Sequence, residues 1–573
     1  MNSTEFPGVF GRLVAEAVPG ILRHQRPDGS IIYDEKAPLI YPQQAIYPLA
    51  FCFAGKDPER RHAGSPEIAR AIAKLGTFLL ERYDDTGHFQ YDSYGYAVKT
   101  IDQRLTFAWV EALRLLRESG ADFDYARWGG KIEKACEMLI EHRLRKLEGV
   151  RRFIGRVLGT GANHVALYFS TIYRAGEVLN RPDLQAYVLP IARAMAADVH
   201  PDGYWEEHSD LLRTGGPTPS YNYLTQAAFA LLYAWTGEGV FRAALERSTR
   251  LHTHFSYPDA RFFDLIDERV RASHDDAPRV WGLFGFSHSP EGRGCAVAHF
   301  NGWRKTVSDV EAISPELLAR LCENFTYWSP GETLTPPFER SEHTARMILP
   351  AAIFRRKSWC VGLSAIRATT AEDAAYADNP FSLDRQKLFS VWHEKTGLLI
   401  DGSHSKGQPE NSTFAGPPGF PADYLPCGGS VGEENMELVA RAAYKTFFGE
   451  VRIRPLSATT LQIELSVDPA GCNGTYTAAF TLPRRAQALT GLNGREFALG
   501  DAPLELSAAD LGGGFKFGNV TVTGADVRVN WPMAPFNSYT ADHKAWPHTY
   551  ALRVSMELPL QRRSTLVSIT VNG

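Results

Sequence analysis

The chain has 573 residues, 44% of them hydrophobic and 22% charged, and a formal net charge of −4. This length exceeds one ordinary hydrophobic core and predicts two domains, and the composition supports neither a disordered nor a membrane class. Basic residues are spread along the whole length, which argues against a nucleic-acid partner recruited by a strong positive field.

Signals for export, membranes and disulfides are weak. Residues 1–12 lack a basic region followed by an apolar run, and no stretch of eighteen apolar residues occurs, so no membrane partner is expected. As written the chain is expected to be cytoplasmic, or periplasmic or secreted if an export signal was trimmed. The seven cysteines lie far apart without a CxxC pair, so neither a disulfide framework nor a zinc knuckle is indicated.

The first part of the chain, residues 1–335, is predicted to be a helical domain, because apolar residues recur three and four positions apart in long windows. The clearest windows are 68–80, 105–116, 132–144, 164–179, 187–197 and 224–235.

A short turn phrase recurs between these helices. It begins at Asp28, Asp85, Asp202 and, more loosely, Asp259, with a fainter copy at Glu148. Successive copies are 57, 63, 54 and 57 residues apart, which leaves room for two helices and their connections. The repeat predicts stacked helical hairpins that close into an (α/α) incomplete toroid rather than an open solenoid. In a toroid the turns would gather at one mouth of the ring and line a cleft.

The second part, residues 345–573, changes to short alternating or β-branched runs separated by Gly, Pro and Asn. This pattern predicts an antiparallel β-sandwich domain. The segment 402–432 is too long for an ordinary hairpin loop, and we expect it to reach toward the first domain as a cleft wall. The predicted strands are 359–366, 388–393, 397–400, 451–453, 459–467, 475–482, 520–529, 550–558 and 564–571.

The most informative polar pair is Asn163 and His164, which follow a glycine-containing run at the head of an amphipathic helix. Two polar side chains at such a helix start are typical of a binding site. The alternative is that Asn163 merely caps the helix and His164 is an ordinary first-turn residue.

A loop some forty residues later is rich in aromatic and ionisable side chains. It contains Trp205, Glu207, His208 and Arg213, and leads through a Gly-Gly-Pro-Thr-Pro run into Tyr221, 57 positions after His164. A loop that only connects two helices does not need so many aromatic and ionisable side chains, so this loop is a candidate part of a functional site.

In these residues the chain resembles polysaccharide lyases of the heparinase II/III-like and alginate lyase type. The resemblance rests on the Asn-His pair, the following Asp-Gly turn with nearby Glu and Arg-Thr, and the tyrosine beyond. It implies an α/α toroid, an antiparallel β-sheet domain and β-elimination on an acidic oligo- or polysaccharide. Ala162 precedes the pair where the alginate lyase pattern has a second Asn, and the path to Tyr221 is longer. The uronate polymer is therefore left open.

The chemistry of such a site follows from its substrate. Cleavage of a uronic acid polymer by elimination removes the proton at C5 and expels the oxygen at C4, so the adjacent carboxylate must first be neutralised. Asn163 and His164 suit that role, since they can stabilise the enolate that develops in the transition state. The resemblance implies that Tyr221 is the base, the acid or both, and His164 is an alternative base.

Further candidates surround this core. An ordinary tyrosine has a pKa of about 10, so a phenolate would need a neighbour such as Arg213, His208 or Arg104. Gln103 and Arg104 are candidates to bind the uronate carboxylate. Tyr223 competes with Tyr221, and Tyr94 could stack on a sugar ring. The resemblance also implies a histidine from the sheet domain, His404, with His393 as its rival.

Two other functions remain open. A glycoside hydrolase on the same scaffold could use two carboxylates from Asp202, Glu206, Glu207, Asp210 and Asp102, and a noncatalytic carbohydrate-binding protein would also use aromatic turns. We expect no required cofactor and no catalytic metal, because the pair His252 and His254 lacks a carboxylate at ligand spacing. A structural metal ion in the sheet domain and a homodimer are both compatible with the sequence.

Overall fold

The computed structural model describes residues 6–35, 38–93, 96–100, 103–149, 161–206, 216–269, 279–368, 383–418, 423–470, 474–537, 540 and 542–572. The chain divides into two compact units. The first contains Met1–Gly215, Tyr221–Leu251 and Pro278–Leu334, and the second contains Gly216–Ser220, His252–Ala277 and Thr335–Gly573. Two segments of the second unit therefore lie inside the sequence of the first.

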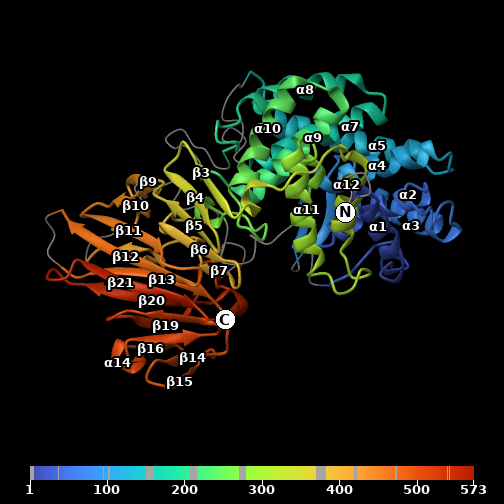
Figure 1. Cartoon of the computed structure of the whole chain (residues 1–573). Coiled ribbons are helices and arrows are strands. Elements are labelled where there is room, and N and C mark those ends of the chain that lie inside the picture. The colour runs from blue at the N-terminus through green and yellow to red at the C-terminus, as the bar shows by residue number, and fades with distance from the viewer. Residues whose placement is uncertain are drawn as a thin grey trace. The chain divides into compact units, whose positions relative to one another are not determined.

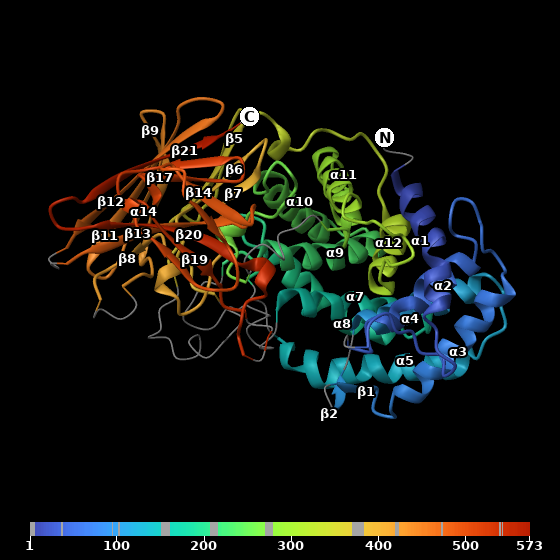
Figure 2. The same cartoon turned by 90° about the horizontal axis from the view of Figure 1, so that it is seen from below.

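Helices dominate the first unit (Figure 1 and Figure 2). Among the described residues of this unit, the strands β1 (Phe89–Ser93) and β2 (Tyr96–Thr100) form one antiparallel hairpin. The helices are α1 (Phe6–Arg23), η1 (Pro42–Ala45), α2 (Ile46–Phe53), α3 (Pro66–Arg82), α4 (Gln103–Glu118), α5 (Tyr125–Leu139) with a π turn Ile140–Leu144 and a 3-10 turn Arg145–Leu147, α7 (Ala162–Val178), α8 (Pro182–Ala197), α9 (Pro219–Thr236), α10 (Gly239–His254), η5 (Leu283–Phe286), α11 (Pro290–Arg304) and α12 (Pro315–Tyr327).

The helices follow from the apolar periodicity and from local start signals. In α3 the side chain of Ser65 accepts a hydrogen bond from the N–H of Ile68, and Pro66 occupies the first helical position, a combination that favours a helix start. One face of α3 is buried at intervals of three and four residues: Ile68, Ala71, Ile72, Leu75 and Leu79.

A ring of inner helices forms the core of this unit. Helix α2 packs against α4, α4 packs against α7, and α12 packs against α2. The C-terminal parts of α7 and α9 also meet, because the rings of Tyr173 and Trp235 stack with centroids 5.8 Å apart. This arrangement is the predicted α/α toroid.

The recurring turns share one backbone geometry. In three copies the glycine has a φ of +86° to +93°, and an added Cβ would meet a helix carbonyl oxygen at 2.2 to 2.6 Å. Only glycine fits such a close approach in the left-handed region. The three contacts are Gly29 with Lys74, Gly87 with Lys134 and Gly203 with Arg247, and Ala260 takes a left-handed φ in the fourth copy. Each of these turns therefore packs closely against a neighbouring helix. Their expected position at the mouth of a cleft stays a prediction.

The second unit consists of antiparallel sheets. Strand β12 shows why: its residues alternate between half-buried and buried positions, as one covered sheet face requires. Figure 1 shows the strands layered side by side. The sheet orders are β15-β14-β17-β18-β21-β12-β11-β10-β9, β16-β19-β20-β13-β8 and β3-β4-β5-β6-β7. The strands are β3 (Glu342–Arg346), β4 (Ala351–Arg356), β5 (Trp359–Ser364), β6 (Phe389–His393), β7 (Gly397–Ile400), β8 (Phe414–Ala415), β9 (Gly428–Glu434), β10 (Glu437–Ala443), β11 (Phe447–Pro455), β12 (Thr460–Pro469), β13 (Tyr476–Pro483), β14 (Ala488–Gly491), β15 (Glu496–Ala498), β16 (Leu504–Leu506), β17 (Gly514–Phe517), β18 (Val520–Thr523), β19 (Arg528–Met533), β20 (Ala551–Leu558) and β21 (Ser564–Val571).

One hydrophobic core joins the three sheets, and it contains Val361 of β5, Phe447 of β11, Ile463 of β12 and Val554 of β20. The predicted antiparallel β domain is therefore confirmed. The segment 402–432 carries a short turn, Pro409–Asn411, together with β8 and the start of β9. Within the described part of the chain, no helix combines the length and apolar character needed to cross a bilayer.

Candidate active site

The candidate residues of the first unit lie in the first turns of three helices. Gln103 is the first residue of α4, His164 is the third of α7, and Tyr221 is the third of α9. Helix N-termini carry partial positive charge and unpaired N–H groups, which favour anions. These polar residues therefore lie at positions where the helix N-termini would stabilise a bound carboxylate.

Asn163 does not cap its helix. The N-cap of α7 is Gly161, which makes no side-chain capping bond. The Asn163 side chain is only 1% exposed, and neither its Oδ1 nor its Nδ2 has a hydrogen-bond partner among the described residues. Leaving a buried amide unpaired costs about 1–3 kcal/mol, and a ligand that pairs with both ends of the Asn163 amide would recover that cost.

His164 is half-buried and contacts Gln103. The Gln103 Nε2 lies 3.0 Å from the His164 Nδ1. The backbone oxygen of Gln103 also accepts a hydrogen bond of 3.1 Å from the Thr171 hydroxyl, two turns further along α7. The structure thus brings together two residues that are 61 positions apart in the sequence.

A buried ion pair holds α4 and α7 together further along. Arg174 Nε donates to Glu111 Oε1 at 2.5 Å, and both side chains are buried. Because α4 and α7 are joined at two levels, the relative position of Gln103 and His164 is fixed by the fold rather than by a ligand.

Arg104, expected to bind the carboxylate or a phenolate, already has partners. Its Nη1 donates to Glu316 Oε1 at 2.8 Å, and its guanidinium lies over the Trp281 ring at 4.7 Å. Neither Glu316 nor Trp281 was singled out from the sequence, since no spacing signal links residues this far apart. The Glu316 carboxylate offsets the charge that Arg104 could offer a substrate.

The two candidate tyrosines, Tyr221 and Tyr223, differ in their burial. Tyr223 is 1% exposed, packs against the Phe286 ring with centroids 4.7 Å apart, and its hydroxyl donates to the Arg279 carbonyl at 3.5 Å. Burial raises the pKa of Tyr223 well above the usual tyrosine value. Tyr221, by contrast, is half-buried. Tyr223 is therefore a core residue, and Tyr221 is the better candidate for proton transfer.

Trp205, expected to contact substrate, also packs in the core. Its side chain is 5% exposed and stacks on Phe229 with centroids 5.0 Å apart, and its indole N–H donates to the Met195 carbonyl at 2.9 Å. Its backbone N–H donates to Asn222 Oδ1 at 3.1 Å. Trp205 thus anchors the turn beside the start of α9 rather than presenting a stacking surface.

His404, expected to be catalytic, has the contacts of a structural histidine. It is 1% exposed, its Nδ1 accepts the Gln386 N–H at 3.3 Å, and its Nε2 donates to the Leu265 carbonyl at 3.0 Å. Burial, aided by the charges of Lys387 and Arg385, lowers its pKa to about 3. Both ring nitrogens are used by these contacts, which argues against catalysis by His404, and its catalytic role stays a prediction.

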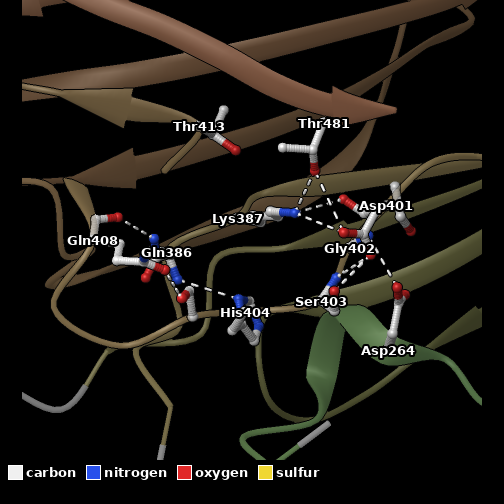
Figure 3. A network of polar contacts seen from close by, with 12 residues as sticks. Asp264, Gln386, Lys387, Asp401, Gly402, Ser403, His404, Gln408, Thr413 and Thr481 are labelled. Carbon is white, nitrogen blue, oxygen red and sulfur yellow. Dashed lines mark hydrogen bonds and ion pairs between the residues drawn. The ribbon is translucent and has the colours of Figure 1, made fainter. Parts of the chain in front are cut away.

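The surroundings of His404 form a polar network inside the second unit (Figure 3). Lys387 donates to Asp401 Oδ2 at 3.1 Å and to Thr481 Oγ1 at 2.6 Å, and Asp264 accepts the Gly402 N–H at 3.0 Å. The rival His393 is likewise structural: it is fully buried, and its Nε2 meets the Ala458 carbonyl at 2.9 Å.

Some of the other predicted residues are described in the structure and some are not. Asp202, a candidate hydrolase carboxylate, lies in its Asp-Gly turn with Oδ2 3.6 Å from the His200 Nδ1. Among the described side chains, no group of three or more His, Cys, Asp or Glu is arranged to hold a metal ion. The candidates outside the described residues are Tyr94, Asp102, Glu207, His208, Asp210 and Arg213.

Comparison with known proteins places the fold. No family model and no curated protein matches the sequence. Among solved structures, heparinase III is similar with a TM-score of 0.52 at 11% identity, over 96% of this chain and 80% of that chain. A Paenibacillus xanthan lyase is similar with a TM-score of 0.52 at 11% identity, over 100% of this chain but only 58% of that chain. At these identities the likeness is one of fold, and it confirms the resemblance to toroid-type polysaccharide lyases at that level.

Proposed function

We propose that this chain is a polysaccharide lyase that cleaves a uronic-acid-containing glycan by β-elimination. The proposal is carried by the Asn163 amide, which is buried, unpaired within the described residues and adjacent to His164. The shared fold with heparinase III and xanthan lyase supports it.

In the proposed reaction Asn163 and His164 bind the uronate carboxylate and stabilise its enolate form. A base takes the C5 proton, the C5–H electron pair becomes the C4–C5 double bond, and the C4–O bond breaks. The leaving oxygen then takes up a proton. Tyr221 serves as base, acid or both, and the positive ends of α4, α7 and α9 favour the extra negative charge.

The test measures two products in parallel. The full chain is incubated with a panel of uronate polymers, including glycosaminoglycans and alginate, while ultraviolet absorbance and reducing ends are followed. Elimination produces both signals, because the new double bond is conjugated with the carboxylate. Reducing ends without absorbance would instead identify a hydrolase, and neither signal on any uronate polymer would argue against an enzyme of this class.

A matched pair of variants tests the role of Tyr221. Tyr221→Phe removes only the phenolic oxygen, so turnover should fall by about 10²- to 10⁴-fold while polymer binding persists. Tyr223→Phe, two positions away in the core, should keep turnover within a few-fold of the wild type. Equal activity of the wild type and Tyr221→Phe would exclude Tyr221 from the mechanism.

A further inference from the structure

The contact between Gln103 and His164 favours one of the two positions for the imidazole proton. The Gln103 Nε2 lies 3.0 Å from the His164 Nδ1. An amide nitrogen donates and does not accept hydrogen bonds, so the Nδ1 must be the acceptor. The single proton of the neutral ring is then on Nε2.

This contact is built into the helix pair. Gln103 is only 5% exposed, and its backbone oxygen is held by the Thr171 hydroxyl at 3.1 Å. The buried pair Glu111 and Arg174 joins the same two helices further along. The amide is therefore aimed at the imidazole before any substrate arrives, as expected of a group that orients its neighbour.

Resting on the proposed function, we infer that Gln103 is a positioning residue that holds His164 as the neutral Nε2–H tautomer. In that state Nε2–H is a hydrogen-bond donor for the uronate carboxylate. The lone pair on Nδ1 is engaged by Gln103, so the neutral ring has none left to take the C5 proton. Tyr221 is then the base that takes the C5 proton. Gln103, by engaging Nδ1, excludes the neutral His164 ring from that role.

The inference differs from the role expected of Gln103 in the sequence, which was to bind the carboxylate itself. A direct ligand would contribute to substrate affinity and would leave the tautomer of His164 unchanged when replaced. A positioning residue would alter the tautomer and chiefly lower the turnover number. The two roles are therefore separable by measurement.

Nitrogen-15 NMR of the full chain, labelled at histidine, reads the tautomer directly and needs no substrate. The His164 signals are identified by their loss in His164→Gln. In the wild type we expect an unprotonated Nδ1 and a protonated Nε2. A protonated Nδ1 in the wild type would overturn the inference, and this readout requires only that His164→Gln folds so that the signals can be assigned.

Two variants complete the NMR test. In Gln103→Glu the carboxylate accepts rather than donates, so the proton should move to Nδ1. Thr171→Val removes a hydrogen bond to the backbone of Gln103 but leaves its amide in place, so the tautomer should stay as in the wild type. An unchanged tautomer in Gln103→Glu would contradict the inference.

Kinetics on the cleaved polymer provide the second readout. Gln103→Leu should lower kcat by about 10- to 100-fold, with KM within about twofold of the wild type. A raised KM with unchanged kcat would instead make Gln103 a substrate ligand. If the wild type cleaves no uronate polymer, the proposed function fails, whereas the NMR experiment still decides the role of Gln103.

Discussion

At the scale of single residues, two buried asparagines behave in opposite ways. Asn163 has no partner among the described residues. Asn222 is also buried, but it accepts from the Trp205 N–H and donates to Gly203 and Ser248. A polar group without partners opposes folding, whereas one that is fully hydrogen-bonded supports it.

This contrast gives a stability prediction. Asn163→Leu should raise the free energy of unfolding by about 1–3 kcal/mol, because it removes an unpaired buried amide, and it should abolish turnover. Asn222→Leu should lower that free energy by about 3 kcal/mol, at roughly 1 kcal/mol for each lost hydrogen bond. Both are measured by denaturant unfolding. A loss of stability in Asn163→Leu as large as that in Asn222→Leu would mean that Asn163 is a structural residue.

The lowered pKa of His404 leads to a prediction of how the free energy of unfolding depends on pH. Its pKa is about 3 in the folded chain, against about 6.5 in an unfolded one. Between these values the unfolded state binds the extra proton, so stability falls as the pH falls below about 6.5. From pH 7 to pH 5 this one group accounts for a loss of about 2 kcal/mol.

Replacement of His404 isolates that contribution. His404→Gln keeps hydrogen-bonding atoms but cannot titrate, so the difference in Tm between pH 7 and pH 5 should shrink relative to the wild type. The same difference in both proteins would show that His404 does not bind a proton on unfolding. Because activity is not predicted to depend on His404 through catalysis, kcat at pH 7 should stay close to that of the wild type when the variant is folded.

At the scale of elements, glycines have two different uses. In the Asp-Gly turns they allow a positive φ, which a sequence reader can anticipate. In α1, Gly20 is needed because an added Cβ would meet the Glu311 carbonyl at 2.1 Å. Pro19 and several glycines lower the intrinsic helix propensity of α1, although its buried apolar residues recur three and four positions apart.

Two glycines of the repeated turns test the difference between packing and conformation. Gly29→Ala places a Cβ 2.2 Å from the Lys74 carbonyl at a φ of +93°, and should cost at least about 2 kcal/mol. Gly149→Ala meets none of the described residues within 4 Å at a φ of +80°, so against them only the conformational cost of about 1 kcal/mol remains. Thermal unfolding of both variants measures the gap, and equal losses would contradict the packing role of Gly29.

The predicted strand bounds agree with the structure where all residues of a predicted run belong to one strand of one sheet. The run at 564–571 is strand β21, but the run at 520–529 covers β18 and only the first two residues of β19. Strand β18 pairs with β17 and β21, whereas β19 pairs with β16 and β20 in another sheet. Alternation of apolar and polar residues indicates which side chains are buried, but not which sheet a strand joins. The end of strand β18 near Gly524 could therefore not be predicted from the sequence.

The candidate site shows the same limit. The Asn163 and His164 pair is visible in the sequence because both residues lie in one local motif. The Gln103 contact with His164 spans 61 positions, and nothing local predicts it. Helical periodicity also could not choose between Tyr221 and Tyr223, since that choice depends on burial in the folded unit.

At the scale of the whole molecule, the sequence order and the compact units do not coincide. Segments Gly216–Ser220 and His252–Ala277 belong to the second unit, although both precede the β-rich part of the chain. The contacts explain this: Glu268 Oε2 pairs with Arg385 Nη2 at 2.6 Å, and Tyr257 donates to Ser390 at 2.6 Å. The second unit is therefore completed by pieces of the helical half of the sequence.

This interleaving makes a prediction about truncation. A chain ending at Thr335 retains every described helix from α1 to α12, but it leaves Glu268 without Arg385 and Tyr257 without Ser390. Glu268 then loses the cation that compensates its charge, and the apolar side chains of the same segment lose their cover. We therefore expect the shortened chain to unfold without the sharp transition of the full chain in circular dichroism, and to aggregate. A soluble shortened chain with a sharp transition would mean that 252–277 needs nothing beyond the helical part of the sequence.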